Sequence, residues 1–140
     1  MQLFFDFDGT LADSSPGIHA SFEHACSCHE LTAPSYTAFC AAIGPPVQEL
    51  ALRFFPQLGP AELESFRQTF RQDYDQDRFR LCQWFDGVEP TLLALSEIPG
   101  ARLAIITNKP TTPTVELLKA AGFSRYFDLV VGIDYLAIHG

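Results

Sequence analysis

The fold is decided by a stretch near the start of the 140-residue chain, Leu3-Phe4-Phe5-Asp6-Phe7-Asp8-Gly9-Thr10-Leu11-Ala12-Asp13-Ser14. Its first residues are mostly apolar and predict a buried strand over residues 3–8. Alternate residues of a strand point to the same side, so Asp6 and Asp8 should share one face while Phe7 points to the other. Gly9 then permits a sharp turn with the backbone close to a ligand. The stretch therefore predicts a strand that ends in two carboxylates and a tight turn.

These carboxylates are expected at the C-terminal end of the strand, where open α/β sheets form their ligand crevice. Burying two like charges is costly unless a cation pairs with them, and oxygen-only ligands favour Mg²⁺. The competing interpretation is an acidic strand end whose carboxylates are solvated in a turn. An isolated Asp-x-Asp would favour that interpretation, but this pair follows an apolar run and precedes Gly-Thr-Leu-x-Asp-Ser. We therefore predict a metal-assisted site at Asp6 and Asp8.

Two later segments, residues 102–107 and 127–131, also predict buried strands, since they are rich in β-formers and lack polar alternation. A helix over residues 112–121, ended by Gly122, would join them as a βαβ unit. Another helix begins near Pro90, and we expect it to turn Leu92, Leu93 and Leu95 inward. The predicted fold class is α/β with a parallel sheet.

Between residues 15 and 84 no strand pattern appears, and four helices are expected in succession. They would begin near Ser14, Ser35, Val47 and Pro60, where helix-start residues precede apolar residues at helical spacing. We therefore expect an all-helical insertion over residues 15–84 within an α/β core formed by residues 1–14 and 85–140.

The amino-acid composition limits the classes of partner that this protein can bind. Nine basic against 17 acidic residues give a net charge of −8, which argues against nucleic acid as a partner. No apolar run is long enough to span a membrane, and the N-terminal residues lack the basic segment typical of a signal peptide. The four cysteines are then best interpreted as reduced thiols. We expect a cytoplasmic protein.

Residues 6–14 resemble motif I of the haloacid dehalogenase superfamily in its phosphatase branch, D-x-D-G-T-L-x-D-S. Residues 103–110 resemble motif II, a hydrophobic strand that ends in Thr or Ser. The helical insertion is similar to the C1 cap of that superfamily, and residues 44–46 and 85–88 resemble segments of phosphoglycolate-phosphatase-like members. The resemblance implies a truncated Rossmannoid α/β core with a helical cap.

The resemblance also implies a Mg²⁺-dependent phosphatase acting on a small phosphorylated metabolite such as 2-phosphoglycolate. Asp6 would attack phosphorus and form an aspartyl-phosphate, and Asp8 would act as general acid and base. The Asp6 carboxylate and the Asp8 backbone carbonyl would hold Mg²⁺. The residues implied in phosphate binding are Gly9, Thr10, Thr107, Asn108 and Lys109.

The family pattern has two further pieces, a motif III lysine and a motif IV acid pair, that this sequence lacks. Lys109 could replace the lysine, although Asn-Lys-Pro is ordinary in relatives that also keep the later lysine. Asp134 is rejected as a motif IV ligand, because its strand should lie two places from the first strand. We expect the chain to be a fragment, or to pair its open sheet edge with another chain as a homo-oligomer.

Two alternatives to a phosphatase remain open. The chain could be an inactive fragment that serves as a binding or interaction module, or a phosphomutase of the β-phosphoglucomutase type. His24, Cys26, Cys28 and His29 could also suggest a metal site, but on a helix only His24 and Cys28 share a face. Packing is the favoured interpretation of that group.

Overall fold

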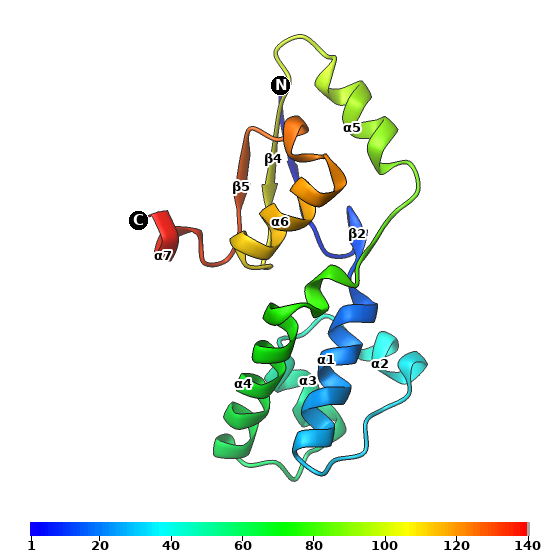
Figure 1. The fold of residues 1–140 in the computed structure, drawn as a ribbon, viewed down its shortest axis with the longest axis vertical. Coiled ribbons are helices and arrows are strands. Elements are labelled where there is room, and N and C mark those ends of the chain that lie inside the picture. The colour runs from blue at the N-terminus through cyan, green and yellow to red at the C-terminus, as the bar shows by residue number, and fades with distance from the viewer. Residues whose placement is uncertain (140) are drawn as a thin grey trace. The chain divides into compact units, whose positions relative to one another are not determined.

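The computed structural model describes residues 1–139, and the chain divides into two compact units (Figure 1). The α/β unit contains Met1–Ser14 and the chain from Gln83 onward, and the helical unit is Ser15–Cys82. From the sequence we placed Gln83 and Trp84 in the helical segment, whereas the structure places them in the α/β unit. None of the helices among the described residues is long and apolar enough to cross a membrane.

The α/β unit is built on a three-stranded parallel sheet of β1 (Gln2–Phe5), β4 (Arg102–Ile106) and β5 (Leu129–Val131). Its order is β1-β4-β5, so the strand before Asp134 lies two places from β1, as predicted. Leu103 and Ile105 in the middle of β4 are buried, which explains the apolar run of that segment. The expected α/β class with a parallel sheet is confirmed.

β1 is shorter than predicted, because the chain turns immediately after it. The carbonyl of Phe7 accepts the backbone N–H groups of Thr10, Leu11 and Ala12 at 3.2, 2.9 and 3.3 Å. These bonds curl the chain and end the strand at Phe5. Phe7 lies just beyond the end of β1, and its side chain is fully buried.

A second, two-stranded sheet closes the α/β unit where the helical segment leaves and returns. β2 (Ala12–Asp13) pairs antiparallel with β3 (Gln83–Trp84), and Phe85 donates its N–H to the Leu11 carbonyl at 3.1 Å. The Trp84 ring packs edge-on against Phe7 with centroids 5.3 Å apart. Strands of two residues show no periodicity, so the sequence did not predict them.

Helices α5 (Val88–Ser96), α6 (Thr111–Ala121) and α7 (Tyr135–His139) and the short 3₁₀ helix η2 (Ser124–Tyr126) complete this unit. α6 follows β4 and precedes β5 in the chain (Figure 1). It ends at Gly122, whose φ of 75° is left-handed, as predicted. In α5 only Leu92 is buried; Leu93 is 47% exposed, contrary to expectation, because it lies about 100° further around the helix.

The helical unit contains α1 (Ser15–Cys28), α2 (Tyr36–Ala42), α3 (Val47–Phe54), α4 (Pro60–Gln76) and the 3₁₀ helix η1 (Arg78–Arg80). The four predicted helices are present and begin within one residue of their expected starts. Phe22 of α1 is fully buried at the centre of an aromatic cluster. The rings around it are those of Phe39, Phe54, Phe55 and Phe66.

Candidate active site

The candidate residues follow two neighbouring strands of the sheet. Asp6 and Asp8 come directly after β1, and residues 107–109 come directly after β4. The two strands are parallel and paired, with Phe5 opposite Ile105. Both segments therefore leave the sheet at the same edge, where α/β folds place ligands.

Asp8 and Lys109, 101 residues apart in sequence, form an ion pair. The Lys109 Nζ lies 3.3 Å from Asp8 Oδ1, and the Ser14 hydroxyl donates to the same oxygen. The Lys109 side chain is only 2% exposed, whereas that of Asp8 is 37% exposed. The Lys109 ammonium also lies 5.6 Å from the centroid of the Phe7 ring, a cation–π distance. One carboxylate oxygen is thus held by two donors, while the Asp8 side chain as a whole stays partly accessible to solvent.

Asp6 differs from Asp8 in its surroundings. Its residue is exposed, and its Oδ1 accepts the backbone N–H of Phe7 at 2.7 Å. This hydrogen bond from the next residue orients the Asp6 carboxylate, which stays exposed to solvent. An exposed carboxylate that is fixed in direction has the accessibility that a nucleophile requires.

Gly9 and Thr10 form the turn after Asp8, and both are exposed. Gly9 has a φ of 78° and donates its N–H to the Ala12 carbonyl at 2.8 Å. A side chain would strain this left-handed backbone, so the turn needs glycine.

Thr107 and Asn108 link β4 to Lys109. Thr107 is buried, and its hydroxyl oxygen accepts the backbone N–H of Lys109 at 3.2 Å. Asn108 is exposed. The hydrogen bonds thus bring Asp8, Lys109 and Thr107 together, while Asp6, Gly9, Thr10 and Asn108 stand at the exposed rim of the same two segments.

Ser14 was not among the candidate residues. It is 4% exposed and its hydroxyl reaches Asp8 because the turn and β2 fold residues 9–14 back. The available signal was its position as the last residue of the D-x-D-G-T-L-x-D-S pattern. Its role becomes visible only when the backbone path is known.

Asp6 and Asp8 supply the oxygen donors that Mg²⁺ prefers, so the residue types fit this metal. Among residues 1–139, no group of three or more His, Cys, Asp or Glu side chains is arranged to hold a metal ion.

The acidic and thiol groups outside this site have other surroundings. Asp134 accepts the backbone N–H of Thr111 at 2.7 Å, so its carboxylate is engaged at the first turn of α6. Burial, with a contribution from Glu23, raises the pKa of the Cys26 thiol to about 12, which makes it a poor metal ligand. All four cysteines are free thiols.

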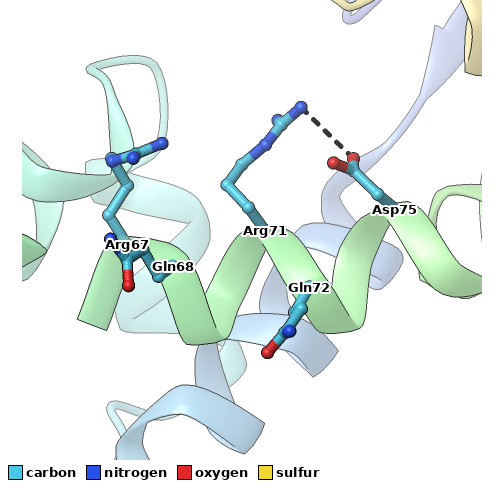
Figure 2. A pocket seen from close by; sticks show the side chains of 5 residues that line it. All are labelled: Arg67, Gln68, Arg71, Gln72 and Asp75. Carbon is cyan, nitrogen blue, oxygen red and sulfur yellow. Dashed lines mark ion pairs between the residues drawn. The ribbon is translucent and has the colours of Figure 1, made fainter. Parts of the chain in front are cut away.

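A surface depression of about 520 Å³ lies along α4 (Figure 2). Its lining residues are Arg67, Gln68, Arg71, Gln72 and Asp75. Both arginines already have carboxylate partners, Arg71 with Asp75 at 3.2 Å and Arg67 with Glu64 at 2.6 Å. The depression contains no candidate catalytic residue and offers no unpaired cation to an anionic substrate.

Comparison with known proteins places this geometry in context. The family described as haloacid dehalogenase-like hydrolase matches residues 3–139. The tyrosine-protein kinase PtkA of Mycobacterium tuberculosis is 34% identical over 130 residues, which are 93% of this chain and 43% of that protein. A phosphoglycolate phosphatase of Pectobacterium atrosepticum is 32% identical over 136 residues, 94% of this chain and 58% of that protein.

Among solved structures, a haloacid dehalogenase-like family protein, SP0104 from Streptococcus pneumoniae, superposes with a TM-score of 0.81 at 28% identity. The match covers 94% of this chain and 60% of that one. The chain thus spans about half the length of the curated relatives it matches.

Proposed function

This chain belongs to the haloacid dehalogenase-like hydrolase family, and on that premise we propose that it carries the nucleophile and the acid–base group of a Mg²⁺-dependent phosphomonoesterase. The substrate would be a small phosphorylated metabolite such as 2-phosphoglycolate. The observation that carries this proposal is the exposed Asp6 two residues from an Asp8 held by Lys109 and Ser14. A phosphoglycolate phosphatase among the relatives supports it.

In the proposed reaction Asp6 forms a bond to phosphorus while the bond from phosphorus to the ester oxygen breaks. Asp8 gives a proton to the departing alkoxide and later takes one from the water that hydrolyses the aspartyl-phosphate. Lys109 and Ser14 both engage Oδ1 of Asp8, which leaves Oδ2 to carry the proton.

Charge is the second requirement, because a carboxylate must approach an anionic phosphate. Mg²⁺, when bound to the Asp6 carboxylate and the Asp8 backbone carbonyl, would offset this repulsion. Lys109 contributes a positive charge to the same edge of the sheet. Thr107, Asn108 and the turn at Gly9 and Thr10 would bind phosphoryl oxygens. The helical unit would act as a cap that excludes water during transfer. In the whole protein, the motif III lysine and motif IV acids of the family pattern would complete the site.

A second candidate is a binding or interaction module without turnover. It is favoured by the outer edge of β1, which no strand among the described residues pairs and where Phe4 is 62% exposed, and that edge would also support a homo-oligomer. A phosphomutase would differ from a hydrolase by transferring the phosphoryl group to a sugar hydroxyl.

The deciding experiment measures release of phosphate from p-nitrophenyl phosphate by the whole protein, as wild type and as Asp6→Asn, with Mg²⁺ and with a chelator. We expect turnover only for the wild type with Mg²⁺. Glu97→Gln, which removes one exposed carboxylate from the same unit, is the matched control and should behave like the wild type. Equal turnover by wild type and Asp6→Asn would exclude Asp6 as the nucleophile, and absence of turnover in both would favour the interaction module.

A further inference from the structure

We infer that Gly132 and Asp134, in the loop that follows β5, are positioning residues for Lys109. The inference rests on the proposed function, since Lys109 matters to the chemistry through its contact with Asp8. It assigns a task to a segment with no member among the candidate catalytic residues.

Three hydrogen bonds tie this loop to the segment between β4 and α6. Asp134 Oδ1 accepts the Thr111 backbone N–H at 2.7 Å, and Gly132 donates its N–H to the Thr111 hydroxyl oxygen at 3.1 Å. Ile133 donates its N–H to the Lys109 carbonyl at 3.3 Å. Consecutive residues of one loop thus hold the backbone on both sides of Pro110.

Close packing reinforces these bonds. A Cβ at position 132 would lie 2.4 Å from the backbone N of Thr111 and 2.5 Å from the carbonyl O of Lys109. Neither atom belongs to a flexible side chain, so any larger residue would have to move the backbone itself. Only glycine lets the two loops approach so closely.

The constraint reaches the Lys109 ammonium through its own main chain. The Lys109 N–H donates to the Thr107 hydroxyl and its carbonyl accepts from Ile133, so both peptide groups that flank its Cα are held. Its side chain is nearly completely buried and ends 3.3 Å from Asp8 Oδ1. Releasing the loop after β5 should therefore let the ammonium move away from Asp8 and become accessible to solvent.

The sequence offers an internal reference for measuring that movement. Lys109 and Lys119 are its only lysines, and Lys119, in the last turn of α6, is exposed. Acetylation with acetic anhydride, followed by mass spectrometry of the lysine peptides, gives the labelling rate of Lys109 relative to that of Lys119. In the wild type Lys109 should react far more slowly.

Two variants weaken the tie by different routes: Asp134→Ala removes the acceptor of the Thr111 N–H, and Thr111→Val removes the acceptor of the Gly132 N–H with little change of shape. Both should raise the relative labelling of Lys109. Asp134→Asn keeps an acceptor oxygen and should restore the wild-type ratio. Thermal unfolding of each variant ensures that labelling is measured on folded protein.

Asp128→Ala is the matched control. Asp128 also accepts a backbone N–H, that of Leu103 at 3.2 Å, but it precedes β5 whereas Asp134 follows it. Its loss should lower stability without changing the relative labelling of Lys109. An unchanged ratio in both Asp134→Ala and Thr111→Val, or an equal rise in Asp128→Ala, would overturn the inference.

Turnover provides a separate measurement. If the wild type hydrolyses p-nitrophenyl phosphate, Asp134→Ala should lower kcat on the order of tenfold through displaced Lys109, with rescue by Asp134→Asn. If the wild type shows no turnover, the proposed function fails, while the labelling ratios still decide whether the loop positions Lys109.

Discussion

Asp8 and Lys109 are unequal partners, because their exposure to water differs. The Lys109 side chain is 2% exposed and that of Asp8 is 37% exposed. A carboxylate that loses the ammonium can be hydrated, whereas a buried ammonium that loses the carboxylate stays in a poorly solvated place. We therefore expect Asp8→Asn to destabilise the protein more than Lys109→Met, by about 1–3 kcal/mol. Denaturant unfolding of both variants tests the order, and a larger loss in Lys109→Met would contradict it.

The same residues show which features of the candidate site could be predicted from the sequence. Asp6 and Asp8 could be singled out because two carboxylates at the end of an apolar strand are costly without a cation. The Asp8–Lys109 contact could not be derived from spacing, since 101 residues separate the partners. Lys109 was a candidate only through the resemblance of its segment to motif II. Ser14 was missed because its role depends on the turn at residues 9–12.

At the scale of elements, the helices of the helical unit could be predicted and the short strands could not. Pro60 and Ser35 mark helix starts by local chemistry, and Ser35 does cap α2 by accepting the Ala38 N–H. The end of β1 at Phe5 and the β2–β3 pair are set by hydrogen bonds to residues distant in sequence or in a turn. Local sequence patterns do not reveal such bonds. This explains why the end of β1 and the β2–β3 pair were not predicted.

The contact between α1 and η1 gives a prediction for one pair of elements. A Cβ at Gly17 would lie 2.2 Å from the carbonyl O of Arg78, a backbone atom. Gly17→Ala should therefore push α1 and η1 apart and destabilise the protein by about 1–3 kcal/mol or more. Gly59→Ala is the control, because the nearest atom to its Cβ would be a Glu62 side-chain oxygen at 3.6 Å. Equal unfolding midpoints for the two variants would show that α1 and η1 are not in close contact.

The start of β4 and the residue before β5 are joined by a charged contact that depends on pH. Arg102 Nη1 lies 2.6 Å from Asp128 Oδ1. The hydrogen bond from Arg102, and to a smaller extent the one from the Leu103 N–H, holds the pKa of the Asp128 carboxyl below its usual 3.8. A lowered pKa in the folded state means that the contact stabilises the protein above pH 3.8 and that this contribution is lost as the pH falls through the lowered value. As the pH falls below 3.8, the free energy of unfolding of Asp128→Asn should therefore decrease less than that of the wild type. Thermal unfolding across this range measures the difference, and parallel curves would contradict the assignment.

At the scale of the whole molecule, the sheet presents apolar side chains that nothing in the described chain covers completely. The register aligns Phe4 with Ala104 and Ala104 with Leu129, and Phe4 and Leu129 are 62% and 44% exposed. Exposed apolar side chains beside an open edge strand favour association. We expect the chain to self-associate in sedimentation experiments and Phe4→Lys to shift it toward monomer. Monomeric wild type at high concentration would exclude pairing through this edge.

The division into two units predicts that the molecule does not unfold as one body. The chain has a single tryptophan, Trp84, which lies in the α/β unit against Phe7 and Phe123, so its fluorescence reports that unit. Most helical residues belong to the helical unit, so far-UV circular dichroism reports chiefly the unfolding of that unit. Phe22→Ala would leave a cavity at the centre of the helical unit and cost about 3–5 kcal/mol there. The dichroism transition should then move to lower temperature while the Trp84 transition stays in place. If both transitions move together, the units are thermodynamically coupled, and the helical unit cannot open and close as an independent cap.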